Sequence, residues 1–167
     1  MVWLSTEEIL KALKLKYSSP QWATIEELRC GTGFNYKETS YNPQRSMDLF
    51  VINLYPSKNF HRICFEIKVS RSDFMNEIKK PEKKTTSLSL VNEFYFVTPK
   101  GLLKSEEIPE ECGLIEVSPR DKKIGVVVPY LFKTIVKAPY RENKTIPIQF
   151  VASIARRAQK IEGESIE

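Results

Sequence analysis

The chain carries, at residues 47–69, the segment MDLFVINLYPSKNFHRICFEIKV. Residues 47–54 are almost wholly apolar, whereas residues 62–69 alternate between polar and apolar side chains. Between them, Tyr55-Pro56-Ser57-Lys58-Asn59 has the composition of a turn. The segment therefore predicts two adjacent antiparallel strands joined by a short connection.

The spacing of three charged residues in this segment is the main functional signal. A turn centred on Ser57 pairs Asp48 with Glu66, because each lies nine residues from that centre. Directly opposed residues of an antiparallel pair have Cα atoms about 4.5–5.5 Å apart and point to one face. Lys68 shares that face roughly 6.5–7 Å further along. The sequence thus predicts two carboxylates and one ammonium group that converge.

Two carboxylates this close repel one another unless a cation neutralises them. A hard divalent cation, Mg²⁺ or Mn²⁺, is the natural partner, and the Ile67 carbonyl can supply a further oxygen ligand. Lys68 can orient or activate a water and stabilise charge that develops on a phosphate. The alternative interpretation is an ordinary half-solvated antiparallel strand, in which polar and apolar residues also alternate. An Asp inside a strand that is apolar on both faces, as around Asp48, disfavours that alternative.

The other elements are predicted from periodicity, capping and turn residues. Trp22–Arg29 fits either a strand or a short helix, and residues 34–45 form a loop. The remaining predictions are helix 6–17 behind a Ser5–Glu8 capping box, helix 70–80, helix 82–90, strand 94–98, a hairpin of 112–117 with 124–128, and a final helix 147–160 with Ile148, Val151, Ile154, Ala155 and Ala158 on one face. Residues 1–161 then form a single α/β domain with a mixed sheet and flanking helices, and residues 162–167 an acidic, frayed tail.

Composition narrows the function further. The net charge of +5 permits a phosphate-bearing partner. The three cysteines lie far apart, which favours buried thiols over a disulfide framework or a zinc site. The single histidine, His61, makes a Ser-His-Asp hydrolase or a His-rich zinc site improbable. No apolar stretch approaches a membrane span and no signal-peptide core is evident, which predicts a cytoplasmic protein without membrane partners.

At Asp48 and Glu66-Ile67-Lys68, followed by a helix and another strand, the sequence resembles the PD-(D/E)xK nuclease superfamily. It more closely resembles small bacterial and phage proteins related to the MmcB-like DNA-repair group. The segments that carry this likeness are Trp22-Ala23, Glu27–Gly33, Arg45–Asp48, Phe65–Phe74, Pro81-Glu82-Lys83, Phe94-Tyr95-Phe96 and Gly113–Val117. Met47 stands where the family usually has proline.

The resemblance implies a restriction-endonuclease-like fold with an α-β-β-β-α-β core, to which a C-terminal hairpin and helix are added here. It implies catalysis by Asp48, Glu66 and Lys68, with Asp48, Glu66 and Ile67 as ligands of Mg²⁺ or Mn²⁺. An acidic residue from the first helix or strand often joins such a site, and Glu27 is the first candidate and Glu8 the second. Each is equally consistent with ordinary surface charge.

Further residues are candidates with open alternatives. Ser70 and Asp73 either support the site or only cap the following helix. The basic residues either form a solvated face or hold DNA phosphates; they are Arg45, Arg71, Lys79, Lys80, Lys83 and Lys84.

The predicted function is metal-dependent hydrolysis of DNA phosphodiesters in DNA repair, recombination or phage DNA processing. The alternatives are a catalytically silent DNA-binding or repair-scaffold module on the same fold, and a phage-assembly protein without a nucleic-acid role. The oligomeric state is left open, including a homodimer.

Overall fold

The computed structural model describes residues 3–35, 37, 39–120 and 129–164 of the chain. These residues form an α/β fold around a six-stranded mixed sheet in the order β1-β2-β3-β4-β5-β6. The strands are β1 (Trp22–Arg29), β2 (Ser46–Asn53), β3 (Arg62–Ile67), β4 (Glu93–Pro99), β5 (Gly113–Pro119) and β6 (Tyr130–Val136). The helices are α1 (Thr6–Lys16), α2 (Arg71–Ile78), α3 (Glu82–Leu90) and α4 (Ile148–Glu164).

The sheet combines two kinds of strand connection. β1, β2 and β3 form an antiparallel meander. β4 runs parallel to β3 and β5 parallel to β4, whereas β6 returns antiparallel to β5. Parallel neighbours need a crossover connection, and α2 and α3 form the one between β3 and β4. The end of β3 therefore leads directly into α2, which places the motif residues beside a helix.

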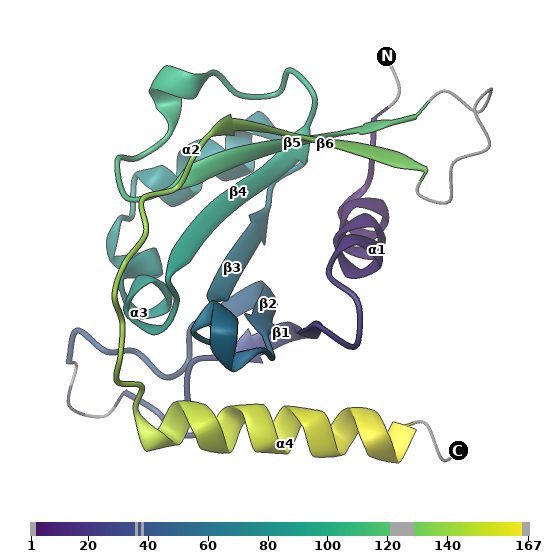
Figure 1. Cartoon of the computed structure of the whole chain (residues 1–167). Helices are drawn as coiled ribbons and strands as arrows, with labels where there is room; N and C mark the ends of the chain where they lie inside the picture. Colours follow the sequence, from purple (N-terminus) through teal and green to yellow (C-terminus); the bar gives the residue numbers. More distant parts are fainter. Residues whose placement is uncertain (1–2, 36, 38, 121–128, 165–167) are drawn as a thin grey trace.

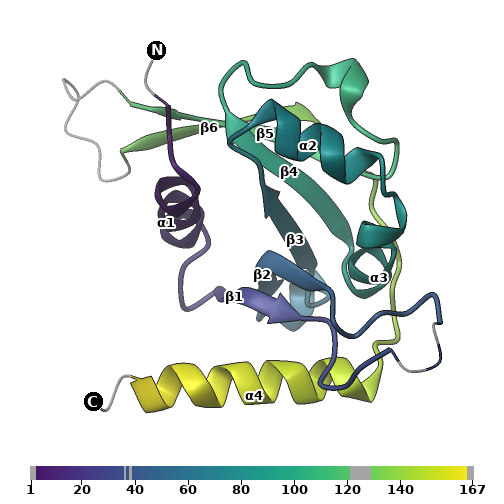
Figure 2. The same cartoon turned by 180° about the vertical axis from the view of Figure 1, so that it is seen from behind.

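Helices cover both faces of the sheet (Figures 1 and 2). α2 and α3 lie on one face, where the rings of Phe74 and Phe96 pack edge to face with centroids 5.1 Å apart. α1 lies on the other face and contributes Ile9 and Leu13 to a second apolar cluster that includes Phe65. α4 packs along the edge strand β1. No helix in the described ranges is long and apolar enough to cross a bilayer.

Several local predictions are confirmed. Ser5 and Glu8 form a reciprocal capping box at the start of α1. Trp22–Arg29 is a strand rather than a short helix. α2 and α3 occupy the two predicted helical segments, and all three cysteines are buried free thiols.

The structure pairs β5 with a different segment from the one predicted for the C-terminal hairpin. β5 pairs with Tyr130–Val136, with Ile115 opposite Thr134. The strand expected at residues 124–128 lies outside the described residues, since 121–128 are not described. β6 is a strand that the sequence prediction missed.

The final helix forms where the sequence predicts it, but only Ile154 of the predicted apolar face packs against the core. The residues that α4 buries are Phe150 and Ser153, whereas Ile148 is 82% exposed and Val151 is exposed as well. Ser153 Oγ donates a hydrogen bond to the Arg29 carbonyl (2.7 Å) and Arg157 Nε donates one to the Glu26 carbonyl (3.2 Å), so two polar contacts attach the helix to β1. The helix also continues to Glu164, past residue 161 where a frayed tail was expected.

Candidate active site

The register of β2 against β3 brings Asp48 and Glu66 together. The ladder pairs Leu49 with Phe65 and continues to Ile52 with Arg62, which is the register that the sequence spacing predicted. One step further along, Asp48 stands at the position opposite Glu66. Asp48 Oδ2 accepts a hydrogen bond from the Ile67 backbone N–H (2.8 Å), which ties this carboxylate to β3.

Lys68 lies between carboxylates from two different elements. Its Nζ is 3.1 Å from Glu66 Oε1 and also forms an ion pair with Glu77 of α2. All three side chains are largely buried, with Lys68 at 14% exposure. Glu77 was not among the predicted site residues, although it lies three positions after the buried Phe74 and therefore on the same side of α2. That spacing is the signal that could have identified it.

Glu27 approaches the same group from β1. The β1–β2 ladder pairs Glu26 with Leu49 and Leu28 with Met47, but it omits Glu27 and Asp48, which stand between these pairs. Glu27 has a left-handed backbone (φ 49°), and its charge contributes to raising the pKa of Asp48. Glu27 therefore remains a candidate fourth carboxylate at an irregular point of the edge strand.

Glu8, the second acidic candidate, does not belong to this site. Its carboxylate accepts a hydrogen bond from the Ser5 backbone N–H (2.7 Å) at the start of α1. α1 packs in the apolar cluster on the sheet face opposite to α2. The capping role explains Glu8 fully.

The crowded carboxylates change the pKa values of the site. Burial, and then the charges of Asp48 and Glu77, raise the pKa of Glu66 to about 8. Burial also raises the pKa of Asp48, while the Ile67 N–H and Lys68 oppose that rise. Burial lowers the pKa of Lys68, but Glu66 and Glu77 raise it to a net value of about 12. Lys68 is therefore a cation at neutral pH and can donate hydrogen bonds, but it does not accept a proton.

A pocket of about 270 Å³ opens beside this group. Its lining includes Glu66, Lys68 and Glu77 together with Arg45, Lys83 and Lys84. Lys84 is only 4% exposed and pairs with Glu111 at 3.4 Å. In the described part of the chain, the buried Nε of Arg45 has no hydrogen-bond partner. The pocket is thus lined by both carboxylates and cationic side chains.

The other predicted residues lie outside this pocket. Arg71 is exposed and forms a two-point ion pair with Glu107, and Lys79 and Lys80 are exposed beyond the end of α2. Ser70 is the N-cap of α2, where its hydroxyl accepts a hydrogen bond from the Asp73 N–H (3.3 Å). Asp73 is exposed in the first turn, so the capping alternative holds for this pair.

The oxygen atoms of Asp48, Glu66 and Ile67 are the candidate ligands for a divalent cation. Among the described residues, no three Asp, Glu, His or Cys side chains are arranged to hold a metal ion. The predicted set needs only two side chains, Asp48 and Glu66, together with the Ile67 carbonyl. These two carboxylates are hard oxygen donors on neighbouring strands, and the charge of Asp48 raises the pKa of Glu66, so a cation between them relieves their repulsion. The donor set therefore fits Mg²⁺ or Mn²⁺.

Among known proteins, the chain is similar in structure to one solved protein. No protein-family model matches the chain, and no similar protein is found among the curated ones. A solved structure described as SPO1766, a protein of unknown function from Silicibacter pomeroyi, is similar, with a TM-score of 0.52 and 18% sequence identity. The similarity covers 87% of this chain and 82% of that one. At this identity the likeness concerns the fold alone.

Proposed function

We propose that the chain is a PD-(D/E)xK-type nuclease with a restriction-endonuclease-like core that hydrolyses DNA phosphodiesters with Mg²⁺ or Mn²⁺. The observation that carries the proposal is the juxtaposition of Asp48 and Glu66 on neighbouring strands, with Lys68 beside them. The element order around these residues, three antiparallel strands followed by a helical crossover to a parallel strand, is the core that such a nuclease requires.

The roles follow from the positions and charges of the side chains. Asp48, Glu66 and the Ile67 carbonyl would hold the metal ion, which when bound supplies a Lewis acid next to the scissile phosphate. Lys68 donates hydrogen bonds as an ammonium group and stabilises negative charge that develops on the phosphate oxygens. Glu77 positions Lys68, because it pairs with Nζ from the helix side. Lys68 is thereby held from both sides before substrate arrives.

The basic residues of the pocket favour a phosphate-bearing substrate. Arg45, Lys83 and Lys84 line the same pocket as Glu66 and Glu77. The unpaired Nε of Arg45 is a buried donor, and a buried donor without a partner is costly unless a ligand satisfies it. A nucleic-acid phosphate matches the geometry of a guanidinium group well.

Cleavage of labelled single-stranded, duplex, flapped and branched DNA with Mg²⁺, Mn²⁺ or EDTA tests this proposal. We expect cleavage that requires the metal and is lost in Asp48→Asn and Glu66→Gln. Glu110→Gln removes an exposed carboxylate outside the site and serves as the matched control. Metal-independent cleavage, or full activity in both site variants, would remove these carboxylates from the mechanism.

A DNA-binding module without catalysis is the second candidate. The observation that favours it is the ion pairing of Lys68 with both Glu66 and Glu77, which also satisfies a purely structural network. Such a module binds DNA in a salt-dependent manner but cleaves none of the substrates with either metal. The same assay therefore separates the two candidates.

A further inference from the structure

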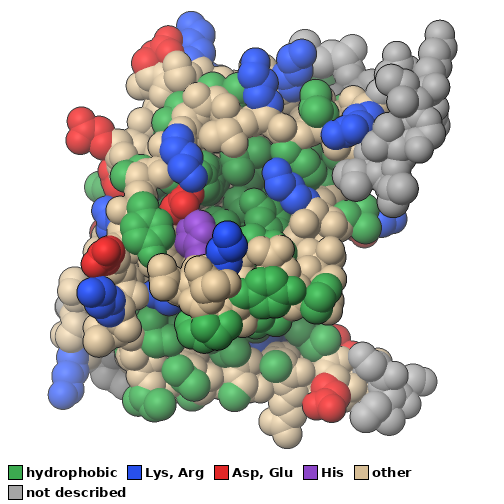
Figure 3. Space-filling model, viewed as in Figure 1, with side chains coloured by type: hydrophobic (Ala, Val, Ile, Leu, Met, Phe, Trp, Pro, Cys, Tyr) green, Lys and Arg blue, Asp and Glu red, His purple; other side chains and the backbone are tan. Residues whose placement is uncertain are grey.

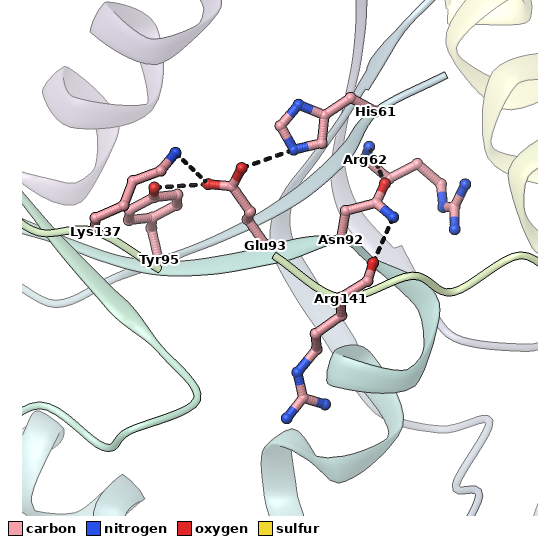
Figure 4. A network of polar contacts seen from close by, with 7 residues as sticks. All are labelled: His61, Arg62, Asn92, Glu93, Tyr95, Lys137 and Arg141. Carbon is pink, nitrogen blue, oxygen red and sulfur yellow. Dashed lines mark hydrogen bonds and ion pairs between the residues drawn. The ribbon is translucent and has the colours of Figure 1, made fainter. Parts of the chain in front are cut away.

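A second polar group lies at the opposite end of β3, on the sheet face away from α2. The carboxylate of Glu93, only 6% exposed, is 3.0 Å from His61 Nε2 and 3.0 Å from Lys137 Nζ, and it accepts a hydrogen bond from the Tyr95 hydroxyl (2.7 Å) (Figure 4). Burial alone would raise the pKa of Glu93, but these three partners lower it to about 2. Glu93 is therefore ionised at neutral pH and holds the His61 ring in place.

Asn92 fixes the segment that follows β6 onto this part of the sheet. Its side-chain oxygen accepts a hydrogen bond from the Arg62 N–H and its amide donates to the Arg141 carbonyl, both at 2.8 Å (Figure 4). The Arg141 N–H in turn donates to the Asn92 carbonyl (2.8 Å). This segment carries Tyr140, whose ring lies 5.7 Å from that of His61. The position of Tyr140 is thus set by a rigid polar frame.

Two adjoining pockets open over this frame. One of about 510 Å³ is lined by Phe60, Arg62 and Lys144 among others, and one of about 440 Å³ by Lys58 and His61 among others. Tyr140 and Asn59 line both, and we call the pair the aromatic pocket. Their volumes lie in the range of roughly 300–1,000 Å³ typical of ligand sites. In the space-filling view the single purple side chain, His61, has Lys and Arg side chains close to it (Figure 3).

The walls of the aromatic pocket present two large rings to solvent. Phe60 is 48% exposed and Tyr140 is 53% exposed. Phe60 also has a left-handed backbone (φ 49°), directly after Asn59 with φ 53°. A bulky residue rarely adopts this conformation, which costs free energy, and here the conformation leads to exposure of the ring rather than to its burial. Folding alone gives no reason to place phenylalanine at this position.

Exposed rings interleaved with cations are the features that bind single strands. Bases stack on aromatic side chains whatever their sequence, while lysine and arginine follow the phosphates. Here Lys58, Arg62 and Lys144 line the two pockets. Among the described residues that line them, Glu142 is the one acidic side chain, and it pairs with Lys144 at 3.5 Å. The nearby carboxylate of Glu93 is already paired with His61 and Lys137. The pocket therefore carries excess positive charge next to stacking surfaces.

We infer that the aromatic pocket binds single-stranded nucleic acid, with bases stacked on Phe60 and Tyr140 and phosphates beside Lys144 and Lys58. This inference does not rest on the cleavage chemistry proposed for Asp48 and Glu66, since it concerns other residues at the other end of β3. Binding can be measured in EDTA, where a metal-dependent nuclease does not cleave.

The test is fluorescence anisotropy in EDTA with labelled oligo-dT, oligo-rU and a duplex of the same length. The wild type should bind at least one single strand more tightly than the duplex, and the tighter of the two identifies DNA or RNA as the preferred strand. Phe60→Gly and Tyr140→Leu should each weaken that binding by about tenfold. Phe60→Trp should retain it, and Phe34→Leu, at an exposed phenylalanine outside the pocket, should match the wild type.

Thermal melts distinguish lost stacking from lost folding. Glycine accepts a positive φ without strain, so Phe60→Gly should melt no lower than the wild type while it binds worse. Unchanged binding in both pocket variants would overturn the inference. An equal loss in Phe34→Leu, or a wild-type preference for duplex, would overturn it as well.

Discussion

Replacing Glu66 with glutamine should stabilise the metal-free protein while it weakens metal binding. Glu66 faces two other carboxylates, those of Asp48 and Glu77, and a single ammonium group, that of Lys68. Glutamine keeps the shape and an acceptor oxygen for Lys68, and Lys68 keeps its ion pair with Glu77. The substitution therefore removes repulsion without leaving the lysine unpaired.

The size of the effect follows from the strand geometry. Side chains of directly opposed residues start about 5 Å apart, and two like charges at that separation repel by about 3 kcal/mol at an effective dielectric constant of about 20. The folded chain avoids part of this cost because the pKa of Glu66 is raised to about 8. We expect Glu66→Gln to increase the free energy of unfolding by about 1–3 kcal/mol, which is roughly 2–12 °C in Tm for a chain of this size.

Metal-free thermal melts and calorimetric Mn²⁺ titration measure both effects. Loss of one ligand should lower the Mn²⁺ affinity at least about tenfold. Glu110→Gln, the control for removal of an exposed carboxylate, should change neither quantity. A lower Tm for metal-free Glu66→Gln would refute the repulsion argument, and an unchanged Mn²⁺ affinity would refute the metal site.

Three further outcomes follow from the structure. Lys68→Ala should reduce single-turnover cleavage at least about 100-fold, while Lys100→Ala, at an exposed lysine, leaves it unchanged. Because Lys68 neutralises two carboxylates, its loss should also lower the Tm. The pKa of Glu93 is lowered from an ordinary 4.5 to about 2, which should add roughly 2–3 kcal/mol to the free energy of unfolding above pH 4.5, and this contribution is lost as the pH falls toward 2. In urea unfolding, the free energy of unfolding should therefore differ less between pH 6 and pH 3 in Glu93→Gln than in the wild type. Phe150→Ala should lower the free energy of unfolding by about 3–5 kcal/mol, because Phe150 is fully buried. Ile148→Ser, at an exposed position, should change it by no more than about 0.5 kcal/mol, and urea unfolding of each variant measures both values.

The central pair of strands could be predicted because its information is local. The turn and the charged residues lie within one short segment, and alternation fixes which side chains share a face. A slip of one residue would have moved Glu66 to the apolar face, so the buried Ile63, Phe65 and Ile67 specify the register as strongly as the turn does. The observed pairs of β2 with β3 follow this register.

The partners that complete the site depend on tertiary packing, which the local pattern does not contain. Glu77 reaches Lys68 only because α2 folds back over the sheet end, and Lys84 is buried only because α3 follows it. Among the basic residues, Lys83 and Lys84 line the pocket but Lys79 and Lys80 do not. In the sequence these four lysines are equivalent.

The errors at the C-terminal end have a similar physical origin. The apolar run IGVVV at residues 124–128 was a stronger strand signal than Tyr130–Val136, yet the register of β5 selects the second segment. In α4, helical periodicity alone does not distinguish a buried face through Ile148 and Val151 from the observed one through Phe150 and Ser153. The side of α4 that faces inward carries Phe150, whose ring packs against Phe50, and Ser153, which donates a hydrogen bond to β1.

Joint use of the two proposed surfaces constrains the substrate. His61 and Glu66 are five residues apart on one extended segment and point to opposite faces, so roughly 16 Å of strand and the thickness of the sheet separate them. A nucleic acid in contact with both must turn sharply around the molecule. Duplex DNA, with a persistence length of about 150 base pairs, resists such a turn, whereas a single strand does not. The two proposals together therefore favour a DNA with a single-stranded segment, a free strand or a flap, over an uninterrupted duplex.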